Sequence, residues 1–145
     1  MNMINEIKVK YIPTKISSQP ISSAVEAIRL FKLLWDQDTL EYVETFNVIL
    51  LNRANIPIGF FNTSKGGITS VVVDLRVIMA TALKCAATSI VIAHNHPSGN
   101  LKPSQADIEL TNKMRSAGEL LDIKVLDHII LTKESGVAFS SLNLI

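Results

Sequence analysis

A short apolar stretch that runs directly into two histidines constrains this chain more than any other feature. Ser89 to Ala93 (SIVIA) is rich in β-formers and ends abruptly at the polar sequence HNHPSG of residues 94–99. Asp74 can cap a helix predicted over Leu75 to Ala87, and Pro103-Ser104 opens another helix after the histidines. A buried strand between two helices is typical of an α/β domain.

The remaining apolar stretches predict one further helix and several strands. Ser23, with Glu26 three residues later, matches a capping box, and apolar residues at helical spacing predict a helix over Ala24 to Trp35. The helix after Ser104 is expected to end at Gly118. The pattern predicts further strands at Glu44 to Leu51, Ile56 to Phe61, Ile68 to Val73, Ile123 to Leu126, His128 to Leu131 and Val137 to Ser140. We therefore expect an α/β fold with a mixed β-sheet flanked by helices.

The composition restricts the class of protein. The chain has 145 residues, of which 48% are hydrophobic, and a formal net charge of +1, which together exclude a disordered protein. Its apolar stretches are far shorter than the roughly 20 residues of a membrane-spanning helix, so we expect a cytoplasmic protein with no membrane partner. Ser and Pro near the N-terminus predict an arm and linker over residues 1–21, followed by one domain over residues 22–145.

His94 and His96 give the strongest indication of chemistry. Side chains two residues apart in extended backbone point the same way, so both imidazoles can hold one ion from the end of a strand. Residues 97–103 allow a tight reversal, and Asp107 then lies in the first turn of the returning helix, where it can face the imidazoles. Two imidazoles and a carboxylate suit Zn²⁺ with a position open for water, and also admit Fe²⁺, Ni²⁺ or Mn²⁺.

Asp107 also has a purely structural interpretation. Ser104 and Asp107 are three residues apart and resemble a capping box with Asp in place of the usual Glu or Gln. A negative charge in the first turn also favours the helix dipole. This interpretation leaves the paired histidines unexplained. Ser104 can serve both as a cap and as a hydrogen-bond donor to a substrate.

The order and spacing of these residues resemble a known motif. His94-x-His96-Pro97, followed by Ser104 and Asp107, is similar to the JAMM (JAB1/MPN+) zinc metallopeptidase motif. The surrounding AHNHPSGNLKPSQAD and the later LDHIIL resemble the RadC branch of that superfamily, as do ETFNVILLNRAN and GGITSVVVDLR upstream. The resemblance extends from about residue 22 to the end of the chain. It implies the cytidine-deaminase-like JAB1/MPN architecture.

The resemblance also implies a role for each site residue. His94, His96 and Asp107 would bind one zinc ion per chain, and Ser104 would stabilise the developing oxyanion. Glu44 would accept a proton from a metal-activated water and pass it to the departing amine. The implied reaction is the hydrolysis of a peptide or isopeptide amide bond.

Glu44 is chosen as the base through the resemblance, because it matches the family's Glu before x-Phe. From the residues alone, Glu41 remains a rival, since strand parity does not say which face of the sheet looks at the site. Glu109 is a poorer candidate, because two residues past Asp107 on a helix turns a side chain by roughly 200°.

Other functions stay open at this point. Several branches of the superfamily are non-catalytic, so a JAB/MPN binding module is one alternative. A DNA-repair accessory role follows only from the RadC name. Nucleic-acid binding is doubtful, because the charge is near neutral and about 20 residues precede the first predicted helix, where RadC proteins commonly carry a helix-hairpin-helix region. The sequence indicates neither the peptide or protein substrate nor the oligomeric state.

Four further residues match the family or stand out in the sequence, but have no definite role. Asp127-His128 could orient a ligand imidazole or form a buried structural pair. Arg76 is expected to form a surface salt bridge. Cys85, the single cysteine, is expected to pack in the core, and it excludes a multi-thiolate zinc site.

Overall fold

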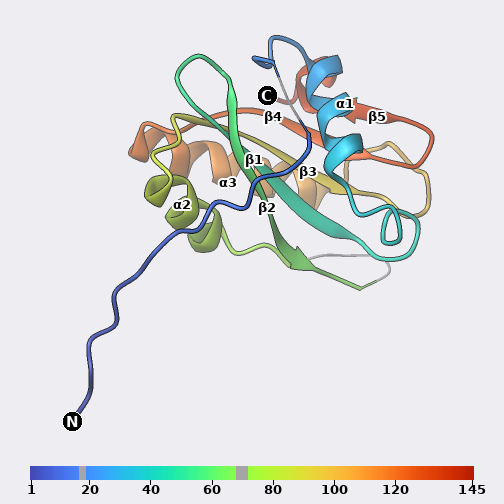
Figure 1. The fold of residues 1–145 in the computed structure, drawn as a ribbon. Coiled ribbons are helices and arrows are strands. Elements are labelled where there is room, and N and C mark those ends of the chain that lie inside the picture. The colour runs from blue at the N-terminus through green and yellow to red at the C-terminus, as the bar shows by residue number, and fades with distance from the viewer. Residues whose placement is uncertain (17–18, 68–71) are drawn as a thin grey trace.

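The computed structural model describes residues 1–16, 19–67 and 72–145 (Figure 1). In these residues the elements are α1 (Ala24–Leu34), β1 (Thr45–Leu51), β2 (Pro57–Lys65), α2 (Leu75–Lys84), β3 (Ser89–Asn95), α3 (Gln105–Leu121), β4 (Lys124–Leu131), β5 (Gly136–Ala138) and the 3₁₀ helix η1 (Phe139–Leu142). The strands form one sheet in the order β2-β1-β3-β4-β5. Among the strands in the described residues, only the β3–β4 pair is parallel, and α3 provides the crossover that joins it. The fold is the expected α/β arrangement of a mixed sheet flanked by helices.

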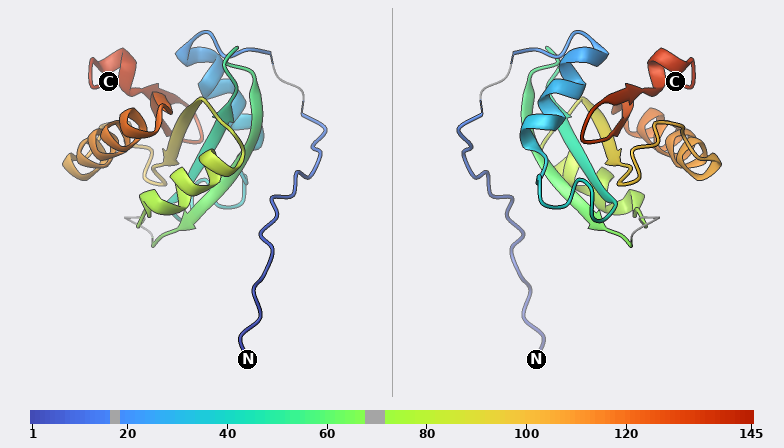
Figure 2. Two further views of the ribbon diagram at one scale, coloured as in Figure 1. Left: turned by 90° about the vertical axis from the view of Figure 1, so that its left-hand side faces the viewer. Right: turned by 90° about the vertical axis from the view of Figure 1, so that its right-hand side faces the viewer.

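Helices cover both faces of the sheet (Figures 1 and 2). One core lies beneath α1 and includes Ile49 and Val91, whereas the other lies beneath α2 and α3 and includes Val48 and Ile92. Neighbouring residues of a strand thus enter opposite cores, as the two-residue repeat of a strand requires. By the same repeat, His94 follows Ile92 on the side of α3. None of the helices in the described residues is long and apolar enough to cross a membrane.

The N-terminal arm leaves the domain in an extended conformation. Residues 1–16 carry no helix or strand, and Figure 2 shows their first half pointing away from the body. Farther along, Tyr11 and Ile12 line a surface groove together with Phe61 of β2 and Cys85.

The β1–β2 hairpin closes through the predicted loop. The Asn52 side-chain oxygen accepts hydrogen bonds from the backbone N–H groups of Ala54 and Ile56, and Asn55 takes a positive φ of 57°. The strand predicted over residues 68–73 lies mostly outside the described residues. Of its described positions, 72 and 73 have no regular structure.

The two late strands predicted around Asp127 are in fact one strand, β4, with an irregularity in its pairing. Ile90 of β3 pairs with Val125, but the next residue, Val91, pairs with Asp127. The skipped residue, Leu126, packs against the core under α1. Without the skip, the two-residue repeat would place His128 on the α1 side; with it, His128 lies opposite Ile92 on the side of α3.

The prediction that α3 ends at Gly118 is wrong. The helix continues to Leu121, and Asp122, at a φ of 55°, donates its backbone N–H to the Gly118 carbonyl. A Cβ atom on residue 118 would lie 2.2 Å from the carbonyl oxygen of Ile123. Gly118 is therefore needed for the close approach of the helix to the chain that enters β4.

Smaller differences concern element ends. Ser23 caps α1 by accepting the Glu26 N–H, but the Glu26 carboxylate accepts from the N–H and hydroxyl of Ser22 instead of closing a capping box. The second helix ends at Lys84, before the predicted Ala87. The last strand is shorter than expected, because η1 takes over after β5.

Candidate metal centre

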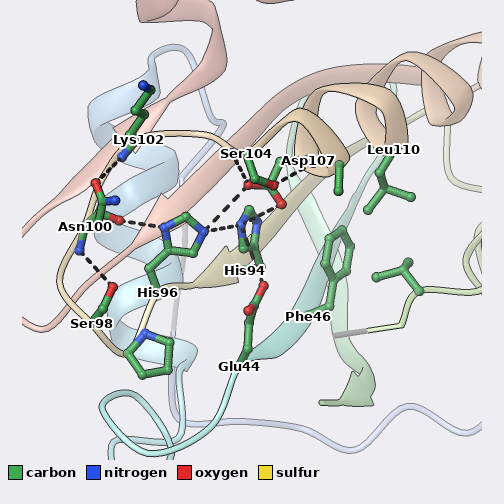
Figure 3. A pocket seen from close by; sticks show the side chains of 13 residues that line it. Glu44, Phe46, His94, His96, Ser98, Asn100, Lys102, Ser104, Asp107 and Leu110 are labelled. Atoms are coloured by element: carbon green, nitrogen blue, oxygen red, sulfur yellow. Dashed lines mark hydrogen bonds and ion pairs between the residues drawn. The ribbon is translucent and has the colours of Figure 1, made fainter. Parts of the chain in front are cut away.

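Two imidazoles and two carboxylates meet at one end of the sheet (Figure 3). Glu44 directly precedes β1, His94 belongs to β3, His96 follows it, and Asp107 lies in the first turn of α3. One ligand atom from each of the four residues can be chosen so that all lie within 4.8 Å of one another. All four line a cavity of about 460 Å³. The topology therefore gathers the four residues that the sequence separates by up to 63 positions, from 44 to 107.

The spacing of these atoms fits one small cation. The two Nε2 atoms of His94 and His96 are 2.9 Å apart. Asp107 Oδ1 is 3.3 Å from His94 Nε2, and Asp107 Oδ2 is 3.7 Å from His96 Nε2. Atoms that surround a tetrahedral zinc ion at about 2.0–2.1 Å lie roughly 3.4 Å from one another, a separation within the observed range. Glu44 Oε1 stands farther off, 4.0 Å from His94 Nε2.

The two carboxylates of this four-residue cluster also require a positive charge nearby. Within the described residues, the ion pairs of Glu44 and Asp107 are formed with histidines and with no Lys or Arg. Glu44 is only 7% exposed, and partly buried carboxylates without a positive partner are costly. Either a protonated imidazole or a bound cation can supply that charge. The donor set of two nitrogens and carboxylate oxygens suits Zn²⁺ or a similar metal.

The orientation of His96 is set by the loop that follows it. Its Nδ1 lies 2.6 Å from the backbone carbonyl oxygen of Asn100. A carbonyl can only accept, so Nδ1 carries the hydrogen and Nε2 is the atom left to bind a cation. This loop is itself tied back, because the Ser98 hydroxyl accepts the Asn100 N–H and the Asn100 side chain accepts the Lys102 N–H.

The pKa values reflect the crowding of these groups. Burial raises the pKa of Glu44. Burial also acts to raise the pKa of Asp107, but its contacts with the His94 and His96 imidazoles outweigh burial and hold this pKa well below its usual range. The hydrogen bond to Asp107 raises the pKa of His96. A proton on His96 therefore competes with any cation for the site.

Ser104 and Asp107 also form the capping box that their spacing suggested. Ser104 N–H donates to Asp107 Oδ2 at 2.7 Å, and Asp107 N–H donates to Ser104 Oγ at 3.1 Å. The capping box is thus confirmed, but the role of Asp107 is not purely structural in its contacts, because its carboxylate also lies against both imidazoles. The cap fixes the direction of the carboxylate. Ser104 also lines the cavity, and its hydroxyl hydrogen has no acceptor among the described residues.

The rival glutamates lie elsewhere. Glu41 is exposed and pairs with Lys133 at 3.1 Å. Glu109 is exposed on α3, where it accepts a hydrogen bond from Gln105. Of the three glutamates considered, Glu44 is the one beside the histidines.

Arg76 and Cys85 take no part in the cluster. Arg76 pairs with Asp74 on the surface at 2.8 Å, as expected. Cys85 is a partly buried residue that packs against the core under α2 and α3.

Asn95, which the sequence analysis did not single out, holds the segment that carries Glu44. Its side-chain oxygen accepts from the N–H and the hydroxyl of Thr45, at 2.7 and 3.0 Å. Its amide donates to the carbonyls of Leu40 and Val43, at 2.8 and 2.9 Å. Because Asn95 stands between the two histidines in β3, these bonds fix Glu44 relative to both. The signal available in the sequence was an amide side chain between the two histidines, directly after an apolar stretch.

Asp127 and His128 have different roles. Asp127 accepts from the His128 N–H and from the N–H and hydroxyl of Ser140, so it ties η1 to β4. His128 contacts His94, with 2.8 Å between His128 Nε2 and His94 Nδ1. Burial, which is complete for this side chain, lowers the pKa of His128 well below its usual value.

Comparison with known proteins agrees with this fold. A profile of the RadC-like JAB domain family matches residues 21–144. A UPF0758 protein of Flavobacterium johnsoniae is 46% identical over 96 residues, which cover 66% of this chain and 42% of that protein. A UPF0758 protein of Haemophilus influenzae is 35% identical over 140 residues, which cover 97% of this chain and 62% of that protein.

A UPF0758 protein of Thermosynechococcus vestitus is 40% identical over 118 residues, 81% of this chain and 44% of that protein. The chain thus spans between 42 and 62% of the length of these relatives. The family profile, in contrast, extends over most of the chain, from residue 21, just before α1, to residue 144. The chain therefore belongs to the RadC-like JAB domain family.

Proposed function

We propose that this chain is a zinc-dependent hydrolase of peptide or isopeptide amide bonds, with one zinc ion per chain. The observation that carries the proposal is the convergence of His94, His96 and Asp107 at distances suited to one ion, with Glu44 beside them. Structural zinc sites are closed by four protein ligands, whereas hydrolytic sites combine three ligands with an open position. Three ligands at the wall of a cavity correspond to the second kind.

Each residue of the chain has a task in this proposal. A bound divalent cation polarises a carbonyl oxygen and lowers the pKa of a water molecule. Glu44 takes a proton from the attacking water and delivers it to the leaving amine. Ser104 donates its hydroxyl hydrogen to the oxygen that becomes negative. The capping box keeps Asp107 turned toward the two imidazoles while its neighbour Ser104 performs this task.

The cavity that contains the candidate ligands is lined differently on its two sides (Figure 3). The apolar Phe46 and Leu110 lie on one side, and the polar loop with Asn100 and Lys102 lies on the other; all four residues line the cavity. This arrangement favours a polymeric substrate with an apolar residue near the bond that is cleaved.

The test combines metal content with activity. Zinc-loaded wild type, Glu44→Gln and the matched control Glu41→Gln are assayed against libraries of peptide and isopeptide amides, and their zinc is measured by elemental analysis. We expect Glu44→Gln to keep its zinc and to lose at least about 100-fold in activity, because general acid–base catalysis typically contributes 10²–10⁴-fold. Glu41→Gln should behave as wild type, because its partner Lys133 lies on the surface.

Two results would reject the proposal. One is equal activity in Glu44→Gln and wild type. The other is a wild-type protein that holds zinc but cleaves none of the amides, which would instead support a non-catalytic binding module.

A further inference from the structure

A chain of buried hydrogen bonds runs behind His94, away from the cavity. His94 Nδ1 lies 2.8 Å from His128 Nε2, and His128 Nδ1 lies 2.6 Å from the hydroxyl of Thr111. That hydroxyl is in turn 2.7 Å from the backbone carbonyl oxygen of Asp107. The three side chains are each 0–1% exposed. These hydrogen bonds thus join β3, β4 and α3. They begin at one proposed metal ligand, His94, and end at another, Asp107.

The position of every hydrogen in this series of hydrogen bonds follows from the Asp107 carbonyl at its end. A carbonyl only accepts, so the Thr111 hydroxyl gives its single hydrogen to Asp107. The Thr111 oxygen can then only accept, and His128 Nδ1 must be the donor. A completely buried imidazole is neutral, because a charge there would have to leave water, so His128 Nε2 is bare.

The same reasoning determines the tautomer of the proposed metal ligand His94. Since His128 Nε2 is an acceptor, His94 Nδ1 carries the hydrogen between them. A neutral His94 ring then has a bare Nε2, and this is the atom that lies 2.9 Å from His96 Nε2 and 3.3 Å from Asp107. Metal-binding histidines generally need such a partner on the other ring nitrogen to fix their tautomer.

The packing around the rings holds this arrangement in place. Phe139 stacks on His128 with ring centroids 4.4 Å apart, and the Phe46 ring is stacked parallel to His94 at 6.2 Å. The skipped residue in β4 is what brings His128 to this side of the sheet. A ring flip of His128 would have to displace Phe139 and break both of its hydrogen bonds.

We propose that His128 and Thr111 are positioning residues that fix His94 as the Nδ1–H tautomer and thereby present its Nε2 to the metal. This inference rests on the proposed metal site but not on hydrolysis. The Thr111 hydroxyl connects the two proposed ligands. It donates to the carbonyl of Asp107 and, through His128, orients the ring of His94.

The first test reads the tautomer directly in zinc-free protein. Long-range ¹H–¹⁵N correlation spectra of ¹⁵N-histidine-labelled protein, recorded near pH 8, distinguish Nδ1–H from Nε2–H rings. We expect the Nδ1–H form for both His94 and His128. An Nε2–H form of His94 in the folded wild type would overturn the inference, whatever the protein does to amides.

The second test measures zinc affinity by chelator competition in Thr111→Val and Thr111→Ser. Valine has the shape of threonine but no hydroxyl, so His128 is free to adopt the other tautomer and donate to His94. We expect Thr111→Val to bind zinc 10- to 100-fold more weakly, the usual loss for such a partner, and to show a mixture of His94 tautomers. Thr111→Ser keeps the hydroxyl. Its zinc affinity should therefore lie within about three-fold of that of wild type, and its His94 should show the wild-type tautomer.

Equal zinc affinity in the Val and Ser variants would overturn the inference. If Thr111→Val does not fold, the tautomer spectrum of wild type decides alone. A wild type that binds zinc, shows the expected tautomer and cleaves no amide would refute only the proposed hydrolysis.

Discussion

Removing the Asn95 side chain should release the segment that carries Glu44. Asn95 is completely buried and makes four hydrogen bonds, two to Thr45 and one each to the carbonyls of Leu40 and Val43. A buried hydrogen bond contributes about 1 kcal/mol, so Asn95→Ala should lower the free energy of unfolding by about 4 kcal/mol. That is a large part of the about 5–15 kcal/mol that stabilises a typical domain.

Urea denaturation of the metal-free protein provides the assay, with Asn47→Ala as the matched control. Asn47 lies in β1, and among the described residues its side chain takes part in a single hydrogen bond, an exposed one accepted from Asn62 at 3.2 Å, so its replacement should cost less than about 1 kcal/mol. The urea midpoint should fall much farther for Asn95→Ala than for the control, with little change in slope. If the two variants unfold at the same urea concentration, the four bonds do not anchor the segment and the reasoning is wrong.

Three further predictions concern pH, packing and the cap. Because the pKa of His96 is raised in the folded protein, protonation of His96 stabilises the metal-free fold fully below the ordinary pKa of 6.5, and this stabilisation is lost as pH rises through the raised pKa. Zinc affinity should therefore increase over the pH range in which the free energy of unfolding of the metal-free protein decreases. Paired chelator and urea titrations would show both trends. Parallel trends would contradict this. Gly118→Ala should cost about 1–3 kcal/mol in urea, because its Cβ meets the Ile123 carbonyl at 2.2 Å, and an unchanged midpoint would refute that contact. Ser104→Ala should cost about 1 kcal/mol through the lost cap and about 10²-fold in kcat while zinc is retained; unchanged kcat would remove Ser104 from the proposed mechanism.

The features predicted correctly from the sequence depend on short-range patterns. The His-x-His spacing on a strand places both imidazoles on one face, and the Ser104–Asp107 spacing marks the helix start that turns Asp107 toward them. Both follow from the repeat of a strand and the geometry of a helix N-terminus. The core strands were visible for the same reason, since residues such as those of β3 are apolar on both faces.

The features that the sequence did not predict depend on distant contacts. Asn95 bonds with Thr45, 50 positions away, and nothing near Asn95 in the chain indicates that partner. The role of His128 follows from one skipped residue in the pairing of β3 with β4, which a two-residue repeat cannot reveal. Gly118 looked like a helix end, because the need for its missing Cβ arises only from the Ile123 carbonyl that packs against it.

The central claim, one zinc ion held by His94, His96 and Asp107, is tested most directly by anomalous scattering at the zinc edge from crystals grown with zinc. We expect a single strong peak about 2.0–2.2 Å from both Nε2 atoms and from a carboxylate oxygen of Asp107. Well-ordered crystals that show no peak at this point, or a zinc ion bound only elsewhere on the chain, would contradict it.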